Sequence, residues 1–386
     1  MKHPIANRRI RRLIAVLTAL CLLVAAPAAA FASEPVPPAG TEDGQGADPG
    51  LDPWQPEEPD FPDELPDIKT VKAPTAAKAA LAIDAETAEV YSSRNESDPL
   101  PVASVSKLMT VWLVMEKISK ASGSLSDTVT IRSKNIERLS RDSVCGGYVL
   151  KRGAKFTVRQ LLQLTLVSSS NAATVQLGTY VGGTYKNFVK LMNKEAAKLD
   201  LVNSGFTSSC GLNNADMRRF GLMVSGGASG TNIMSAEDVG ELARVLIEKY
   251  PNVLDYSKIS AVKIKDKWIG STNRLLTNSS LKSKAKAYAI DGLKTGYTRR
   301  AGSCLVSTGK ADGMHRLITV FLNDTGRFDH TISLFKNIYA KNPVRLADEP
   351  PAPEPEPVYP DPAYPDPSYP DPTYPDSAYP PLQKAS

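Results

Sequence analysis

The fold of this chain is decided by residues 101–119, which read PVASVSKLMTVWLVMEKIS. From residue 105 onward the stretch is strongly apolar, and it is long enough for a buried helix. Ser104 and Lys107 stand at its start, and their spacing places both side chains on one face of a helix. The partial positive charge at a helix N-terminus would help to bind an oxyanion and would favour a neutral lysine. The pair is therefore a candidate serine nucleophile with a lysine base.

Histidine, the usual base for a serine nucleophile, is scarce in this chain. Beyond residue 32 the sequence has only His315 and His330, and no serine lies in a Gly-x-Ser-x-Gly elbow. Residue order alone does not exclude a Ser–His–Asp triad. Cysteine is also sparse: Cys145, Cys210 and Cys304 include no Cys-x-x-Cys pair, so we expect small buried side chains, no metal and no cofactor.

Two further short motifs follow this stretch. Ser-x-x-Lys alone is uninformative, because the chain contains it at five other places. Ser169-Ser-Asn171 lies in a polar turn between two predicted helices, 158–166 and 172–181. Lys294-Thr-Gly296 occurs once, just before a strand-like segment, and its glycine would let a backbone edge approach a ligand closely. The three motifs in this order are typical of penicillin-binding proteins and class A β-lactamases.

The surroundings of the motifs resemble those of the low-molecular-weight penicillin-binding proteins, which are serine-type D-alanyl-D-alanine carboxypeptidases. The resemblance covers residues 75–345 and implies an α+β fold, in which a five-stranded antiparallel sheet adjoins a helical subdomain with the site between them. Ser170 and Ala172 replace the Gly and Asp that are frequent in the family. The matching segments are Ala103-Ser-Val-Ser-Lys-Leu-Met-Thr110, Ser169-Ser-Asn-Ala-Ala173, Asp291-Gly-Leu-Lys-Thr-Gly-Tyr-Thr298 and Ala301-Gly302.

The resemblance implies a role for each motif residue. Ser104 is the acylated nucleophile and Lys107 its general base. Ser169 relays a proton to the leaving D-alanine, while Asn171 holds the substrate amide. The backbone N–H groups of Ser104 and Tyr297 form the oxyanion hole, whose two donors can stabilise the developing oxyanion by several kcal/mol. The remaining substrate-binding residues are Lys294 and Thr295, which receive the terminal carboxylate, with Gly296 and Arg327 near them.

The implied reaction removes the terminal D-alanine from peptidoglycan pentapeptides through an acyl-enzyme, and the same serine binds β-lactams covalently. If water accepts the acyl group the enzyme is a carboxypeptidase, and if another amine accepts it the enzyme is a transpeptidase. If the bond that is cleaved is an internal one, the enzyme is an endopeptidase. The sequence does not distinguish these reactions. A class A β-lactamase also needs a deacylating Glu roughly 35 residues after the Ser-x-Asn turn. Residues 201–214 contain no acid, and Glu195 and Glu237 flank them. A non-catalytic wall-binding protein would not need the complete motif set.

Local patterns predict the other elements of the globular unit. Strands at both ends with helices between them indicate one mixed sheet built from distant segments. The predicted elements are a hairpin of 78–84 and 88–92 around Glu86-Thr87, helices at 185–199, from Ser235 and at 329–340, and strands at 302–308 and 317–322.

Charge and proline divide the chain into four parts. Residues 1–32 carry five bases, no acid and an apolar run that is short for a membrane span, so they read as a secretory signal. Residues 33–67 carry eleven acids, no base and nine prolines, which predicts a disordered linker. Residues 348–386 carry eight acids, fourteen prolines and Tyr-Pro-Asp-Pro repeats, which predicts an extended disordered tail. The catalytic domain is 68–347, with 40 bases and 22 acids.

This partition also bears on location and partners. We expect a secreted, cell-wall-associated protein, because a tail of this composition supplies neither a β-rich second domain nor a C-terminal membrane anchor. Peptidoglycan stem peptides and β-lactams are the expected ligands, and anionic wall polymers suit the basic domain. Export argues against nucleic acid as its partner. The acidic flanks are expected to act as solubilising spacers or to fold back and screen the domain.

Overall fold

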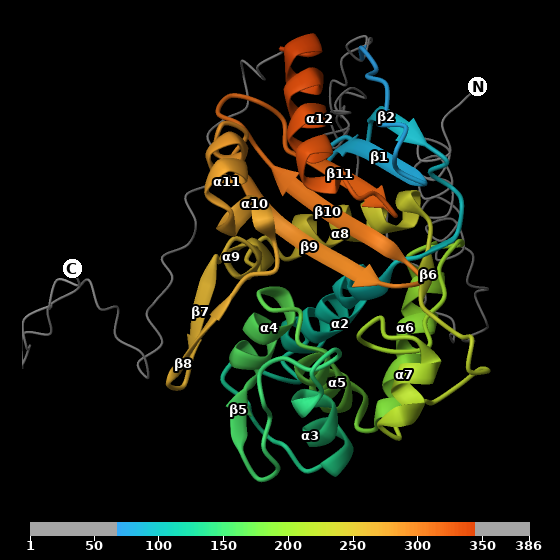
Figure 1. Ribbon diagram of the computed structural model, residues 1–386, viewed down its shortest axis with the longest axis vertical. Helices are drawn as coiled ribbons and strands as arrows, with labels where there is room; N and C mark the ends of the chain where they lie inside the picture. Colours follow the sequence, from blue (N-terminus) through green and yellow to red (C-terminus); the bar gives the residue numbers. More distant parts are fainter. Residues whose placement is uncertain (1–67, 344–386) are drawn as a thin grey trace, which may run out of the picture. The chain divides into compact units, whose positions relative to one another are not determined.

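The computed structural model describes residues 68–343, and Figure 1 shows their arrangement. The predicted signal segment, the linker and the tail lie outside the described residues, so these three predictions stay untested. Within the described part, no helix combines the length and the apolar character needed to cross a membrane.

A five-stranded sheet joins the two ends of the described chain. Its order is β2-β1-β11-β10-β9, and all four neighbouring pairs are antiparallel. The element pattern predicted a mixed sheet, which is wrong; the antiparallel sheet implied by the family resemblance is confirmed. The reason is that β1–β2, β9–β10 and β10–β11 are linked by short turns, which force antiparallel pairing. The strands are β1 (Ala79–Asp84), β2 (Val90–Arg94), β9 (Ile290–Thr298), β10 (Gly302–Gly309) and β11 (Leu317–Leu322).

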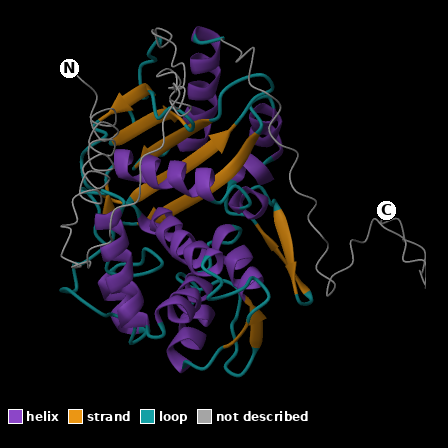
Figure 2. Ribbon diagram, turned by 180° about the vertical axis from the view of Figure 1, so that it is seen from behind, coloured by secondary structure: helices purple, strands orange, loops and turns teal. Residues whose placement is uncertain are grey.

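Alternation along the central strands divides the core between the two faces of the sheet. Leu81 and Val320 belong to the larger apolar cluster, whereas Leu305 and Phe321 belong to the smaller one. Helix α12 (Arg327–Lys341) covers the face with the smaller cluster, and α8 (Ala236–Lys249) covers the opposite face, as Figures 1 and 2 show. Helix α8 lies so close to the sheet that a Cβ on Gly240 would stand 2.8 Å from Leu81 Cδ2.

Helix α2 (Lys107–Ser119) is the centre of the helical subdomain. Its first ten residues are all buried, which is typical of a helix surrounded by protein on every side. The larger apolar cluster runs without a break from one face of the sheet through α2 into the surrounding helices. These helices are α3 (Lys134–Arg141), α4 (Val158–Leu166), α5 (Asn171–Gly182), α6 (Tyr185–Lys198) and α7 (Asn214–Arg219).

Several short elements complete the fold and were not predicted from the sequence. The predicted start of the apolar helix, at residue 105, was two residues too early, because η1 (Ala103–Ser106) is a 3₁₀ helix that leads into α2. The predicted hairpin, the helices at 158–166, 172–181, 185–199 and 329–340, and the helix start at Ser235 are confirmed. The other short elements are β3 (Leu100–Pro101), β4 (Thr128–Thr130), β5 (Lys155–Thr157), β6 (Ile233–Met234), β7 (Ala261–Ile264), β8 (Lys267–Gly270), α9 (Val253–Ser257), α10 (Arg274–Thr277) and α11 (Ser279–Lys286).

Candidate active site

Ser104 and Lys107 lie where the sheet edge meets the helical subdomain. Ser104 is in η1 and Lys107 is the first residue of α2, so the change from 3₁₀ to α-helix falls between them. Lys107 Nζ lies 2.6 Å from Ser104 Oγ. The serine is half-buried, whereas the lysine is fully buried. The predicted nucleophile–base pair is therefore assembled, with the hydroxyl on the accessible side.

The surroundings of Lys107 suit an uncharged amine. Its Nζ also lies 2.7 Å from Asn171 Oδ1 and 2.7 Å from the backbone oxygen of Cys210. Burial lowers the pKa of Lys107 to about 8. A neutral amine has two N–H donors and one lone pair, so it can donate to both oxygens while it accepts the proton of Ser104 Oγ–H.

Ser169 and Asn171 occupy the turn between α4 and α5. Ser169 has a φ of 58°, in the left-handed region that few non-glycine residues adopt. Asn171 begins α5 and donates from Nδ2 to the backbone oxygen of Cys145 at 2.8 Å, which fixes Oδ1 toward Lys107. Ser170 caps the helix, because its side chain accepts from the backbone N–H of Ala173. The residue that departs from the family pattern therefore has a structural use here.

Lys294 brings the sheet to the same cluster. It is buried in β9, and its Nζ donates to Ser169 Oγ at 2.9 Å and to the backbone oxygen of Thr295 at 2.8 Å. Burial first, and then repulsion from Lys107, hold the pKa of Lys294 well below its ordinary value. Thr295 shares a hydrogen bond of 2.7 Å with Thr272, hydroxyl to hydroxyl. Two buried amines close together favour an anionic ligand, because a carboxylate would relieve their repulsion.

Two glycines let backbone segments approach the turn that carries Ser104. A Cβ on Gly296 would stand 2.8 Å from the backbone oxygen of Val102, so β9 can pack on η1 because this position has no side chain. Gly211 has a φ of 82°, and its Cβ would lie 2.0 Å from the backbone oxygen of Ala103. Gly296 therefore allows a close backbone approach, but the partner that the structure shows is the backbone around the nucleophile and not the predicted ligand.

Tyr297 and Arg327 lie at different distances from this cluster. Tyr297 follows Gly296 in β9 with a side chain that is 68% exposed, so the role predicted for it depends on its backbone N–H. Arg327 begins α12, and its guanidinium lies 4.6 Å from the Phe328 ring centroid. Among the described contacts none joins Arg327 to Ser104 or Lys107, and its buried Nε has no hydrogen-bond partner. Its predicted role near the carboxylate stays a prediction.

Sequence reasoning missed three contributors to the cluster. The backbone oxygens of Cys210 and Cys145 hold Lys107 and Asn171, and Thr272 holds Thr295. Every residue has a backbone carbonyl, so residue type does not indicate which carbonyl accepts a hydrogen bond in a site. Thr272 belongs to none of the three motifs. The Cys-Gly pair at 210–211 was the one available signal, because a glycine there predicts unusual backbone geometry.

The three cysteines in the described residues are buried, as predicted, and all three are free, which the sequence had left open. Burial raises the pKa of Cys145 to about 11 and that of Cys304 to about 11, and it also raises the pKa of Cys210. These thiols are therefore protonated at neutral pH, and none is an activated nucleophile.

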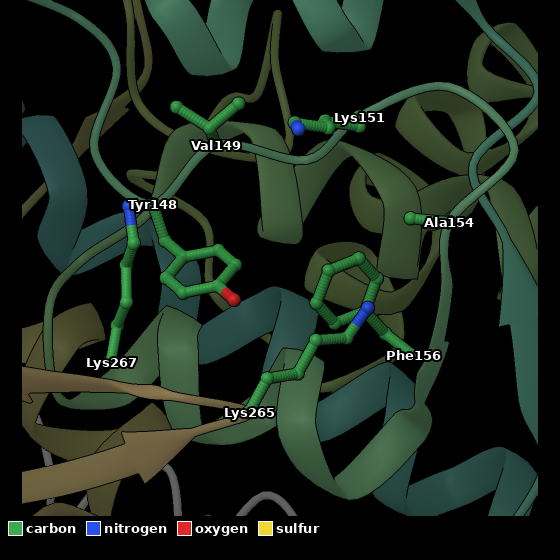
Figure 3. Close-up of a pocket in the computed structure, with 7 residues that line it drawn as sticks. All are labelled: Tyr148, Val149, Lys151, Ala154, Phe156, Lys265 and Lys267. Atoms are coloured by element: carbon green, nitrogen blue, oxygen red, sulfur yellow. The ribbon is translucent and has the colours of Figure 1, made fainter.

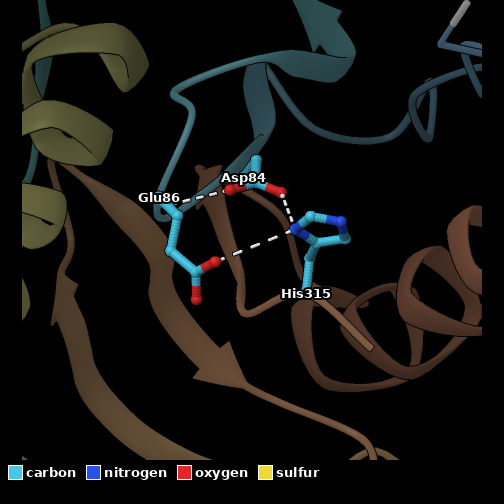
Figure 4. A group of neighbouring side chains, drawn as sticks. All are labelled: Asp84, Glu86 and His315. Carbon is cyan, nitrogen blue, oxygen red and sulfur yellow. Dashed lines mark hydrogen bonds and ion pairs between the residues drawn. The ribbon is translucent and has the colours of Figure 1, made fainter. Parts of the chain in front are cut away.

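One group of side chains has the donor types of a metal site. Asp84, Glu86 and His315 offer ligand atoms within 4.8 Å of one another, and His315 Nδ1 lies 3.1 Å from Asp84 Oδ2 (Figure 4). Asp84 is already used in the β1–β2 turn, because its Oδ1 accepts from the backbone N–H groups of Glu86 and Thr87. This group belongs to the hairpin turn and the loop before β11, not to the catalytic cluster.

Comparisons with known proteins identify the family and the fold of this chain. Over residues 67–326 the chain matches the peptidase S11 family, described as D-alanyl-D-alanine carboxypeptidase. The D-alanyl-D-alanine carboxypeptidase DacF of Bacillus subtilis is 28% identical over 245 residues, which cover 62% of this chain and 55% of the relative. This chain thus spans little more than half the length of such relatives.

Solved structures show the same fold. The peptidoglycan synthesis regulatory factor PBP3 from Streptococcus pneumoniae is 34% identical with a TM-score of 0.63, over 69% of this chain and 72% of that one. Penicillin-binding protein D2 from Listeria monocytogenes, in its cefotaxime-bound form, is 27% identical with a TM-score of 0.56, over 71% of this chain and 100% of that one.

The sheet, the helical subdomain and the lysine-paired serine at their boundary together define the fold of the penicillin-binding proteins. Within that class, this chain belongs to the peptidase S11 family of D-alanyl-D-alanine carboxypeptidases. The family and fold predicted from the three motifs are confirmed.

Proposed function

We propose that this protein is a secreted serine D-alanyl-D-alanine carboxypeptidase, which removes the terminal D-alanine from peptidoglycan stem peptides. The observation that carries the proposal is the position of a buried lysine, with a pKa lowered to about 8, at 2.6 Å from the hydroxyl of Ser104. Such a lysine can take a proton from the hydroxyl near neutral pH, which a solvated lysine with an ordinary pKa cannot do.

In the proposed acylation, Ser104 Oγ attacks the carbonyl carbon of the penultimate D-alanine as its proton passes to Lys107 Nζ. The oxyanion that forms is stabilised by the backbone N–H groups of Ser104 and Tyr297. The C–N bond then breaks, and the terminal D-alanine leaves with a proton delivered by Ser169, which Lys294 Nζ contacts at 2.9 Å. The proton that Lys107 took from Ser104 passes to Ser169 in its place, so that Lys107 is again neutral and Ser169 is again a hydroxyl. Ser104 is left as an ester of the shortened peptide.

Lys294, Thr295 and Asn171 position the substrate in this proposal. The terminal carboxylate is received by Lys294 and by Thr295, whose hydroxyl is oriented by Thr272. Asn171 holds the substrate amide from a side chain that is already fixed on both of its polar atoms. This preorganisation means that little reorganisation is needed when the peptide binds.

Hydrolysis of the ester completes the cycle. We propose that water attacks the acyl carbon as Lys107 takes one of its protons, and that Lys107 then returns this proton to Ser104 Oγ, 2.6 Å from its Nζ, as the ester C–O bond breaks. A β-lactamase would place a carboxylate here, but Glu195 instead accepts from Trp112 Nε1 at 3.1 Å and pairs with Lys198. A β-lactam would therefore acylate Ser104 and stay bound, as the cefotaxime-bound form of the Listeria relative supports.

The chain outside the described residues enters the proposal through its composition. Residues 1–32 are proposed to direct export and to be removed, and 68–347 to form the catalytic domain. The acidic segments 33–67 and 348–386 are proposed to be spacers. Mass spectrometry of the secreted protein tests the first point, because cleavage after Ala32 predicts a defined mature mass.

A defined pentapeptide ending in Lys-D-Ala-D-Ala tests the reaction. Wild-type protein should release D-alanine with water as acceptor, and added amine should compete only if the protein is also a transpeptidase. Ser104→Ala should abolish release, while Ser225→Ala, an exposed serine replaced in the same way, should leave it unchanged. Unchanged release by Ser104→Ala would overturn the assignment, and rapid turnover of penicillin would favour a β-lactamase.

A further inference from the structure

We propose that a second binding site beside the catalytic cluster holds a phosphodiester-linked polymer of the cell wall. The site, here called the lysine pocket, has a floor of Tyr148 and Phe156 and a rim of Lys151, Lys265 and Lys267 (Figure 3). The proposal rests on the proposed function, because a wall enzyme works where such polymers are attached.

The pocket is hollow and has an aromatic base. Its cavity volume is about 290 Å³, just below the range of roughly 300–1,000 Å³ for small-molecule sites. It therefore has room for one unit of a chain rather than for a folded partner. The two rings on the floor meet edge to face with centroids 5.9 Å apart, and Lys265 Nζ lies 4.3 Å from the Phe156 centroid. The Lys265 ammonium thus lies over an apolar floor, which suits a ligand with anionic groups and a carbon skeleton between them.

Both walls of the pocket continue into the catalytic cluster. The first wall, residues 148–156, follows Cys145, whose backbone oxygen accepts from Asn171 Nδ2. The second wall is the β7–β8 hairpin, which leads to Thr272, the hydroxyl partner of Thr295. The walls are joined to each other, because Tyr148 Oη donates to the backbone oxygen of Ile264 at 3.4 Å. Both walls of the lysine pocket are therefore connected, along the chain, to residues that hold the catalytic cluster.

Charge in these two walls is strongly one-sided. Residues 148–156 hold three bases and no acid, and the hairpin 261–270 holds three lysines and a single acid, Asp266. The three rim lysines are exposed, so they keep their hydration and their mobility. Several mobile point charges suit a repeated phosphate better than one fixed carboxylate, for which a planar arginine fork would be the expected partner.

The hairpin adds an aromatic surface outside the pocket. Trp268 is 69% exposed, and it stands opposite Lys263 in the β7–β8 register, so both side chains share the outer face. Lys267, which lines the pocket, precedes Trp268 in the strand and therefore points to the opposite face of the hairpin. The surface of Trp268 and Lys263 is thus separate from the lysine pocket and is not part of the proposed site.

Binding of soluble poly(glycerol phosphate) to full-length protein tests the proposal. The protein carries Ser104→Ala, so that turnover plays no part, and binding is measured by fluorescence anisotropy at low and high salt. Neutralising two rim lysines with Lys265→Gln and Lys267→Gln should weaken binding roughly three- to twentyfold, since an exposed ion pair changes an equilibrium constant by at most about fivefold. High salt should weaken the parent's binding and reduce the difference.

The matched control replaces two lysines on α6, Lys186→Gln and Lys190→Gln, which are also exposed and remove the same charge. Equal loss in both double variants would mean that net charge alone binds the polymer, and the proposal would be wrong. It would also be wrong if a carboxylate polymer of equal charge density bound as tightly, or if the same two pocket substitutions, made in active protein that keeps Ser104, lowered kcat/KM for a short peptide as much as they lowered polymer affinity. Failure of the proposed function is seen separately, as absence of D-alanine release by wild-type protein that still binds the polymer.

Discussion

The charge state of Lys107 can be altered without a change of shape by Asn171→Asp. Asn171 Oδ1 lies 2.7 Å from Lys107 Nζ, so the substitution places a carboxylate beside the amine. An opposite charge at this range shifts a pKa by about 1–3 units toward the charged form. The pKa of Lys107, about 8 in the parent, should therefore rise and the ammonium should persist to higher pH.

The size of the effect follows from the neutral fraction. With a pKa of about 8, about one Lys107 in ten is neutral at pH 7 and about nine in ten at pH 9. Acylation by wild-type protein should therefore quicken about tenfold over this range. A rise of about 1–3 units in Asn171→Asp leaves about one lysine in a hundred to one in ten thousand neutral at pH 7, so acylation should slow about 10- to 1,000-fold there.

The assay is the second-order rate of labelling by a fluorescent penicillin from pH 6 to pH 10.5. Loss of the Asn171 N–H donor also weakens contacts with substrate and with Cys145, but this loss lowers the rate by one factor at every pH. The midpoint of the profile is therefore the readout, and the same change at an exposed position, Asn187→Asp, is the control. Coincident midpoints for Asn171→Asp and wild type would refute the neutral-lysine reasoning, as would a flat wild-type profile between pH 7 and 9.

Three further perturbations test the rest of the site. Lys294→Met should abolish D-alanine release and raise the melting temperature at pH 7. Because the native pKa of Lys294 is depressed, the buried lysine destabilises the fold fully below that pKa, and this cost disappears as the pH rises toward 10.5. A gain in melting temperature that does not shrink at high pH would contradict the depressed pKa. Gly296→Ala should cost about 1–3 kcal/mol in urea unfolding and slow penicillin labelling, because its Cβ meets the Val102 oxygen, whereas Gly270→Ala has open space and should do neither. Thr272→Val removes the hydroxyl that bonds Thr295 and should lower kcat/KM for the peptide about three- to tenfold, whereas Thr272→Ser keeps a hydroxyl and should restore it. Equal activity of the Val and Ser variants would show that Thr272 does not position Thr295.

Elements with strong local signals could be predicted from the sequence. The helix at 158–166 has the bounds that were predicted, and in the structure Thr157 and Gln160 form a capping box with reciprocal side-chain bonds at its start. The helix start at Ser235 was found through its cap, although the side chain of Asp238 turns away and accepts from Asn203 and Ser204. Local chemistry decided these boundaries, so the wider fold was not needed to find them.

Strand β9 could not be predicted, although it carries Lys294-Thr-Gly296. Gly292 and Gly296 weaken it as an isolated strand, and Lys294 reads as a solvated residue. Pairing with β10 and contact with η1 hold this segment extended, and both depend on residues far away in the chain. The motif therefore helped to identify the family correctly, while the local pattern failed to give the conformation of this segment. The contacts made by the backbone oxygens of Cys210 and Cys145 had no residue-type signal at all.

The neighbourhood of β1 and β11 sets the order in which this protein can fold. Ala79 stands opposite Leu322, so the first strand waits for its central partner until nearly the whole described chain has been made. Until then β1 has only β2, and a two-stranded hairpin is marginally stable in water. Strand pairs so far apart in the sequence form slowly, because the entropy of closing the long loop between them is lost before any contact stabilises the pair. A chain that crosses a membrane unfolded would benefit from this delay, since the sheet that completes the catalytic site cannot close until its last strand has emerged.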